Sequence, residues 1–126
     1  MEFPENIEEI KKFAKKIKLD VKYLLGEKYE GYLNLSSVES LPKNIIFNVG
    51  ADLNLSFVKS LPDNIIFNVG GYLDLYSVES LPDNIEFNVG GYLDLSSVQY
   101  LPANTIFNVD DNIYFPTKHK VKVIWS

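Results

Sequence analysis

The chain has 126 residues, of which 46% are hydrophobic and 23% charged, a composition that fits one ordinary globular domain. Its net charge is −5, but the charge is uneven: lysines and acids balance in residues 1–30, nine acids face two lysines in residues 31–110, and one acid faces three lysines in residues 111–126. The acidic middle and the absence of arginine argue against direct binding of nucleic acid or of an anionic membrane, because both need a basic surface.

The absence of cysteine excludes disulfides, thiolate metal sites and a cysteine nucleophile. The N-terminal stretch MEFPENIEEIKKFAKK mixes acids and lysines where a signal peptide needs an uninterrupted apolar run, and no later segment reaches the ~20 apolar residues of a membrane span. We therefore expect a cytoplasmic protein, located in the host cytoplasm if its source is a virus.

Residues 1–30 are predicted to form an N-terminal helical cap. Apolar residues recur at helical spacing from Ile7 to Ile17, after a proline and a glutamate-rich start and before lysines at the end. Asp20 is placed to cap a second short helical turn, which Gly26 would end. Because the end units of a solenoid must cover the apolar end of the stack, we expect this segment to cover the first repeat.

Residues 31–110 consist of four copies of one twenty-residue unit. The copies read GYLNLSSVESLPKNIIFNVG, ADLNLSFVKSLPDNIIFNVG, GYLDLYSVESLPDNIEFNVG and GYLDLSSVQYLPANTIFNVD. A fixed period of this length is typical of a solenoid, in which each unit buries its apolar face against its neighbours. We call the residues at one position of successive units a column.

The apolar columns predict two short strands and a third apolar side in every unit. Residues alternate between apolar and polar in the L-x-L stretch and again in I-x-F-N-V, which places one set of side chains on the inward face. The inward columns begin at Leu33, Leu35, Val38, Leu41, Ile45, Phe47 and Val49. We expect the phenylalanine column to be the main stabilising ladder, because truncation of a buried Phe costs about 3–5 kcal/mol.

The corners of the unit carry turn-forming residues. In Leu-Pro-x-Asn the proline presets the turn, and the asparagine column beginning at Asn44 is expected to cap backbone groups or to adopt a left-handed conformation. The glycines of the next corner predict a positive φ; they are Gly50, Gly70, Gly71, Gly90 and Gly91. The asparagine column beginning at Asn48 is predicted to point outward as a ladder of amides, and an inward ladder is the alternative.

Residues 111–126 are predicted to form a degenerate fifth unit and a closing strand. Ile113 and Phe115 occupy the two leucine positions, and the segment from Lys118 to Trp125 alternates lysines with apolar residues. Lysines on such a terminal strand oppose edge-to-edge aggregation. His119 belongs to this alternation, so we expect no catalytic role for it.

The spacing L-x-L, L-P and I-x-F-x-V-G-G resembles bacterial leucine-rich repeats of the Leu-Pro type. It is still more similar to the twenty-residue, LRR-like repeats of phage and bacterial proteins of unassigned role, over residues 31–115. The resemblance implies a binding scaffold rather than a chemistry. Because the Asn of L-x-x-N is missing and a second strand is present, we expect a straight solenoid rather than a horseshoe: mainly β, right-handed and parallel, with about four and a half coils and an N-terminal α cap.

The sequence predicts no enzyme, no cofactor and no metal site. It contains no G-x-S-x-G, phosphate loop or H-E-x-x-H motif. The GGYLDL stretches resemble calcium-binding GGxGxDx repeats only weakly, because the period is twenty residues and two units carry Asn34 and Asn54 in place of aspartate.

The outward positions are the candidate protein-binding residues, since tyrosines interleaved with acids are typical of an interface. On the first strand they are Tyr32, Asp52, Tyr72, Asp74, Tyr92 and Asp94, joined by Phe57 and Tyr76, which interrupt columns of serine. On the second strand they are Ile46, Ile66, Glu86 and Ile106. For this second set, an interface and simple strand propensity with Glu86 opposing aggregation stay equally open.

We therefore predict a non-enzymatic protein-binding solenoid, which the phage-like resemblance extends to an inhibitor that covers the surface of a host defence protein. An acidic mimic of nucleic acid that blocks a nucleic-acid-binding protein is one alternative. A structural or self-assembling module, and thus a homo-oligomer, is the other.

Overall fold

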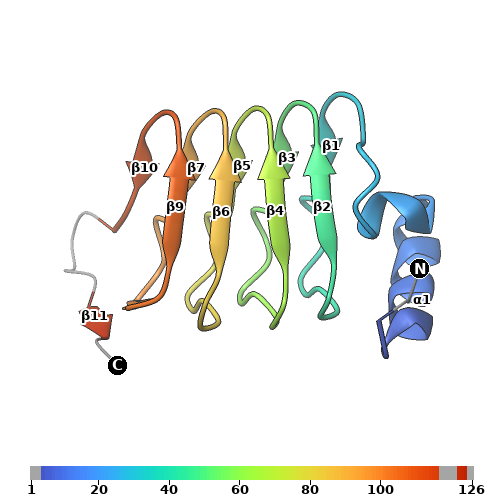
Figure 1. Ribbon diagram of the computed structural model, residues 1–126, viewed down its shortest axis with the longest axis horizontal. Coiled ribbons are helices and arrows are strands. Elements are labelled where there is room, and N and C mark those ends of the chain that lie inside the picture. The colour runs from blue at the N-terminus through green and yellow to red at the C-terminus, as the bar shows by residue number, and fades with distance from the viewer. Residues whose placement is uncertain (1–3, 117–121, 125–126) are drawn as a thin grey trace.

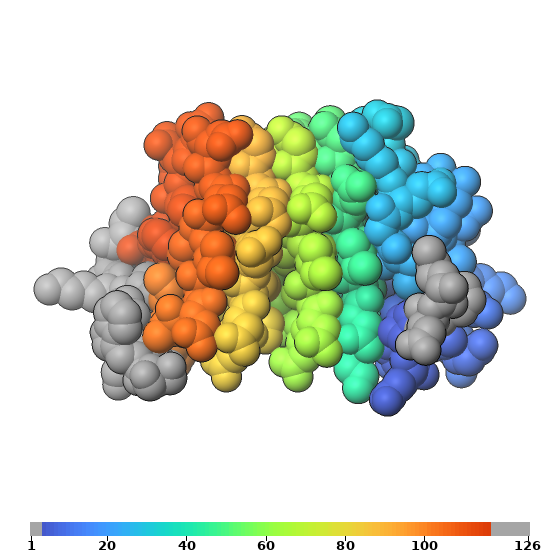
Figure 2. Space-filling model, in the orientation of Figure 1, coloured from blue at the N-terminus to red at the C-terminus, as the bar shows by residue number. Residues whose placement is uncertain are grey.

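A computed structural model describes residues 4–116 and 122–124. The fold is mainly β, with parallel strands stacked as a solenoid of about four turns and one helix, α1 (Ile7–Ile17), at the N-terminal end of the described chain (Figure 1). This architecture confirms the fold class predicted from the repeats. Figure 2 shows successive coils as adjoining bands along the solenoid axis.

Two parallel sheets form two sides of each coil, and residues of neighbouring strands pair at a spacing of twenty, as Leu33 with Leu53 and Phe47 with Phe67. The five-stranded sheet contains β1 (Leu33–Asn34), β3 (Leu53–Asn54), β5 (Leu73–Asp74), β7 (Leu93–Asp94) and β10 (Ile113–Tyr114). The four-stranded sheet contains β2 (Ile46–Val49), β4 (Ile66–Val69), β6 (Glu86–Val89) and β9 (Ile106–Val109). The identical period of sequence and structure therefore keeps every column in register.

The third side of the coil has little regular pairing. A bridge joins Ser60 to Ser80, and β8 (Tyr100–Pro102) pairs in parallel with β11 (Lys122–Ile124). The coil is thus three-sided, which the sequence left open. Of the predicted closing strand only β11 is described; Lys118, His119, Lys120, Val121 and Trp125 lie outside the described residues.

The core consists of the predicted inward columns. Phe47, Phe67 and Phe87 are fully buried, and their rings stack at centroid distances of 5.8 and 5.7 Å. Phe107 continues the stack at 5.6 Å but is only partly buried. The phenylalanine column is thus buried and stacked as predicted, and its stabilising role stays a prediction.

The N-terminal segment is joined to the first coil by polar and apolar contacts. Ile10 and Ala14 of α1 are buried in the common core. The Asn6 amide donates to the Lys43 carbonyl at 2.8 Å and accepts from Asn44 Nδ2 at 2.9 Å, so the start of the helix is fixed to a corner of the first repeat. Asp20 accepts a hydrogen bond from Lys22 N at 3.1 Å, which confirms its predicted capping of the short 3₁₀ helix (Val21–Leu24).

The asparagine corner agrees with the sequence in three coils of four. Asn44, Asn64 and Asn84 have φ values of 68°, 61° and 63°, in the left-handed region. Asn104 does not have a positive φ. In that coil Thr105 instead donates from its backbone N–H and its hydroxyl to the Pro102 carbonyl, so the corner is built differently.

The prediction of positive φ at the V-G-G corner is wrong. Among glycines of the described chain, only Gly26 and Gly31 have a positive φ. The corner needs glycine because coils lie very close together there: a Cβ on Gly70 would collide with the carbonyl of Gly50, and a Cβ on Gly90 with that of Gly70. At Gly70 and Gly90, glycine is thus required by contact between coils and not by backbone conformation.

Candidate protein-binding face

The outward side chains of the five-stranded sheet form one continuous surface, because the residues on either side of each inward leucine point away from the core. We call this surface the Tyr/Asp face. Its members are Tyr32, Asn34, Asp52, Asn54, Tyr72, Asp74, Tyr92, Asp94, Asn112 and Tyr114. Its three aspartates are accompanied by no basic residue, so the face carries a net negative charge.

Tyrosine rings follow one another along this face. Tyr72 and Tyr92 stack almost parallel, with centroids 4.8 Å apart and planes at 10°. Tyr32 lies 6.4 Å from Tyr72, across the coil that carries Asp52, and Tyr114 meets Tyr92 edge to face at 5.6 Å. Because Tyr72 and Tyr92 stack face to face, that pair offers ring edges and hydroxyls to a partner rather than a flat platform of the kind a sugar would cover.

The Tyr72 hydroxyl stays protonated over the physiological range. Burial, the Tyr32 hydroxyl and the Asp52 carboxylate raise the pKa of Tyr72 to about 12. Burial and the Asp74 and Asp94 carboxylates also raise the pKa of Tyr92. Both phenols therefore remain neutral hydrogen-bond donors beside the carboxylates.

The aspartates of the face also have a structural role that the sequence did not reveal. Asp74 Oδ1 accepts from the Tyr76 N–H and Asp94 Oδ1 from the Ser96 N–H, each at 3.0 Å. Asp52 Oδ1 accepts from the Tyr72 N–H of the next coil at 2.9 Å. One oxygen of each carboxylate thus closes a turn or joins two coils.

Asp74 and Asp94 are paired in register on neighbouring strands β5 and β7. Burial, and secondarily the Asp94 carboxylate, raise the pKa of Asp74 even though the hydrogen bond from the Tyr76 N–H lowers it. The charge on Asp74 is therefore unfavourable for the isolated protein at neutral pH.

Phe57 and Tyr76 extend the surface at the turn that follows each short strand. Their side chains are 59% and 56% exposed, which places two large aromatic groups in solvent on consecutive coils. Serine occupies the same positions in the other units. The structure therefore places six of the eight predicted residues on the Tyr/Asp face, and the other two, Phe57 and Tyr76, at the turn that follows it.

The four other predicted residues lie on a separate surface, the outward side of the four-stranded sheet. Ile66 and Ile106 are 43% and 49% exposed, Ile46 is half-buried and Glu86 is exposed. Asn88 Nδ2 donates to Glu86 Oε2 at 3.0 Å. The predicted residues thus form two faces on two sheets.

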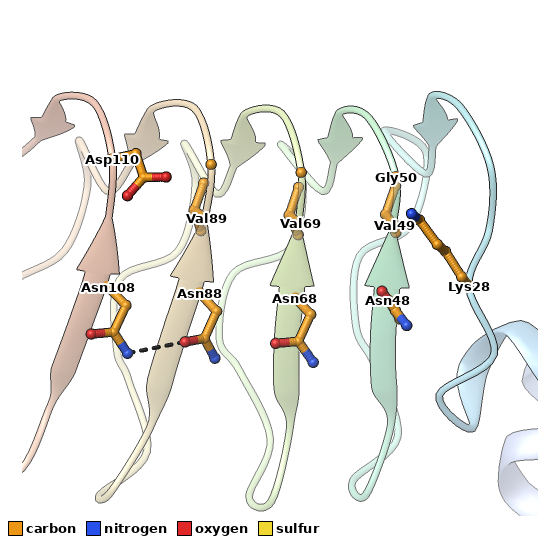
Figure 3. A pocket seen from close by; sticks show the side chains of 12 residues that line it. Lys28, Asn48, Val49, Gly50, Asn68, Val69, Asn88, Val89, Asn108 and Asp110 are labelled. Atoms are coloured by element: carbon orange, nitrogen blue, oxygen red, sulfur yellow. Dashed lines mark hydrogen bonds between the residues drawn. The ribbon is translucent and has the colours of Figure 1, made fainter.

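The second asparagine column also lies on this sheet and points outward, as predicted. Asn108 Nδ2 donates to Asn88 Oδ1 at 3.0 Å. The amides line a shallow groove beside the glycine corner, with Lys28 at one end and Asp110 at the other (Figure 3). The valines and glycines at the end of each strand complete its lining.

Tyr114 is a member of the Tyr/Asp face that is absent from the residues predicted from the sequence. It lies between Ile113 and Phe115, which occupy the leucine positions, and twenty residues after Asp94. Extending the column of Asp74 and Asp94 by a further twenty residues identifies Tyr114. The sequence signal is present, but the decay of the fifth repeat conceals it.

Within the described residues, no group of three or more His, Cys, Asp or Glu side chains is arranged to hold a metal ion. Nor does the described part of the chain contain a helix long and apolar enough to cross a membrane. No protein-family model, curated protein or solved structure matches this chain, so no relative supplies a function or a set of functional residues.

Proposed function

We propose that this chain is a non-enzymatic protein-binding solenoid that holds another protein against its Tyr/Asp face. The observation that carries this proposal is a set of six aromatic side chains, of which four form a row along one acidic sheet face and two are exposed at the turn that follows it. They are Tyr32, Phe57, Tyr72, Tyr76, Tyr92 and Tyr114. Aromatic residues supply large contact areas and are enriched where proteins bind one another.

The geometry of the tyrosines supports this role. A tyrosine side chain has two main torsions, and stacking of Tyr72 on Tyr92 restricts them before any partner arrives. Side chains that are already ordered lose less entropy on binding. The row of phenol hydroxyls beside carboxylates also provides donors and acceptors at short intervals.

The exposed aromatic groups at the turn support the proposal independently. Phe57 and Tyr76 are more than half exposed, so they contribute little to the core. Serine fills the same turn positions elsewhere without loss of the coil. A large exposed aromatic group in place of a sufficient serine is better explained by contact with a partner than by folding.

The LRR-like character of the repeats, which we propose on the sequence resemblance alone, agrees with a binding scaffold. An inhibitor that covers the surface of a host protein is the form of binding that the phage-like resemblance suggests. Mimicry of nucleic acid is the second candidate, favoured by the acidic face; it predicts that the partner is itself a nucleic-acid-binding protein and that DNA or RNA competes for it.

Affinity capture from the native cell, followed by mass spectrometry, tests the proposal. The informative variant replaces Phe57 and Tyr76 by serine, because serine occupies those columns in the other coils and the fold should be retained. We expect the captured partner to bind the double variant at least about tenfold more weakly, a loss of about 1.4 kcal/mol for two exposed aromatic contacts.

The matched control is Ile66→Thr, which alters the exposed side of the other sheet. We expect it to keep full affinity. If the partner binds the Phe57→Ser, Tyr76→Ser variant with full affinity but does not bind Ile66→Thr, the interface lies on the four-stranded sheet and the proposed face is wrong.

A further inference from the structure

The fold needs an acceptor oxygen, and not a negative charge, at the column that contains Asp74 and Asp94. Asn34 and Asn54 occupy this column in the first two coils, and their Oδ1 atoms accept from the Ser36 and Ser56 N–H groups at 3.0 Å. Asp74 and Asp94 make the same bond at the same distance. A neutral amide is therefore sufficient for the turn, and the carboxylates add charge that the turn does not use.

This extra charge has no partner within the described part of the chain. The two ion pairs found there, Lys11–Glu8 and Lys22–Glu27, both lie in the N-terminal segment. The turn bonds use Oδ1 of Asp74 and Asp94, and no described residue donates a hydrogen bond to either Oδ2. Two adjacent carboxylates thus retain acceptor capacity for an external cation.

The surroundings of the pair suit a cationic side chain. Neighbouring parallel strands lie about 4.8 Å apart, so one ammonium or guanidinium group can contact both carboxylates. Aromatic residues neighbour the pair along the chain and across the sheet: Tyr76 follows Asp74 at the turn, and Tyr114 pairs in register with Asp94. Both side chains are exposed, at 56% and 46%, so their rings are accessible to a cation that the carboxylates hold.

We propose that the Tyr/Asp face recognises a basic segment of its protein partner and that Asp74 and Asp94 together hold a lysine or arginine side chain of that segment. This inference rests on the proposed function and names the chemistry of the partner. The charge of the face is complementary to such a segment, because the face contains three aspartates and no basic residue.

Short oligo-arginine and oligo-lysine peptides of equal length, with an oligo-serine peptide as the neutral control, serve as probes in a ¹⁵N NMR titration of the full chain. The Tyr76 and Ser96 N–H groups bond directly to the two carboxylates, so their resonances report occupation of the pair. We expect both cationic peptides to shift these resonances and oligo-serine to leave them unchanged.

The test variant is Asp74→Asn with Asp94→Asn, which keeps the turn bonds in the manner of Asn34 and Asn54. The matched control is Asp63→Asn with Asp83→Asn, which changes the net charge equally at an exposed corner away from the face. We expect the test variant to bind the cationic peptides about tenfold more weakly and the control to bind them as the unaltered chain does.

Absence of shifts at Tyr76 and Ser96, or an equal loss of affinity in both variants, would overturn the inference, since the latter indicates general attraction to an acidic protein. Either outcome leaves the proposed function standing, because that proposal depends on capture of the partner by Phe57 and Tyr76. If the serine variant loses capture of the partner while the peptide titrations are negative, the chain has a protein partner, but that partner is not recognised through a basic segment.

Discussion

One column of the solenoid separates what a residue does for the fold from what it offers to a partner. Asn54 and Asp74 occupy equivalent places and accept the same backbone hydrogen bond at 3.0 Å. Only Asp74 adds a charge, and burial raises its pKa. The comparison within a single chain isolates the effect of the charge, because the surrounding backbone is repeated.

Asp74→Asn should therefore stabilise the protein at neutral pH. A carboxyl group whose pKa is raised in the folded state binds protons more readily there than in the unfolded chain, so its contribution to stability is largest below the ordinary aspartate pKa of about 3.9 and is lost as the pH rises through the folded value. We expect the free energy of unfolding to rise by about 0.2–1 kcal/mol at pH 7, the range for like charges on neighbouring strands.

The gain should disappear in acid, where Asp74 is protonated in both states. Urea unfolding at pH 7 and at a pH below the ordinary aspartate pKa measures the difference. The reverse change, Asn54→Asp, places a third carboxylate beside Asp74 and should destabilise the chain at neutral pH. A destabilised Asp74→Asn variant at pH 7 would contradict this account.

At the scale of single elements, the corners decide how closely the strands can stack. Gly70 and Gly90 lie against the carbonyl groups of the preceding coil, where no side chain fits. The first glycine of the column, Gly50, instead has the ends of the Lys28 and Glu30 side chains as its nearest neighbours. Backbone cannot move aside without displacing a strand, whereas a long side chain can rotate away.

Gly70→Ala should consequently destabilise the protein by about 1–3 kcal/mol, the usual cost of an added methyl group in a packed site. Gly50→Ala adds the same methyl group at the same corner and should cost much less, because its closest contacts are flexible side chains. Chemical denaturation of the two variants compares them directly. Equal effects would show that conformational preference, and not contact between coils, governs this column.

The elements are largely predictable from the sequence, but the reasons for their corners are not. The period of twenty residues by itself predicts the register of Leu33 with Leu53 and the stacking of Phe47 on Phe67, and the fold contains both. The hydrogen bond of Asp74 and the tight contact at Gly70 depend on distances of a few ångströms between backbone atoms. Spacing in a sequence specifies which residues are neighbours, but not which atoms of those neighbours touch.

Predictability is also unequal between the two candidate surfaces. The Tyr/Asp face follows from alternation around each inward leucine, so its residues can be named from the sequence. Its extension to Tyr114 requires the decayed fifth unit to be placed in register, which the pairing of β10 with β7 provides. The separation of Ile66 from Tyr72 on two sheets follows from the glycine corner between them, because that corner divides the two predicted strands.

At the scale of the whole molecule, stability comes from contacts between adjacent coils. Each strand of the two main sheets pairs with the strand twenty residues away, and α1 packs on the first coil. In such an architecture the free energy of unfolding is close to the sum of one term for each coil and one term for each contact between neighbouring coils. When a complete coil is removed, the two coils on either side of it can therefore pair with each other through equivalent columns.

Deletion of residues 51–70 should yield a folded chain with one coil fewer. The cut joins Gly50 to Gly71 and restores the sequence pattern of an ordinary corner. We expect cooperative urea unfolding with a lower midpoint and a smaller m-value, since less surface is exposed on unfolding. Deletion of residues 51–60 removes half a coil, so that the later strands no longer align with their partners, and it should abolish the cooperative transition. Cooperative unfolding of both deletion variants would refute the solenoid account.

The uniform register has a kinetic consequence. Strand pairings in the described chain join residues twenty or twenty-two apart, as Ile46 with Ile66 and Tyr100 with Lys122. Closing such a loop has a modest and nearly constant entropic cost, in contrast to sheet proteins whose partner strands lie far apart in sequence. A chain leaving the ribosome can therefore complete one coil on the previous one as synthesis proceeds, so that the newest apolar layer is the one exposed at each moment.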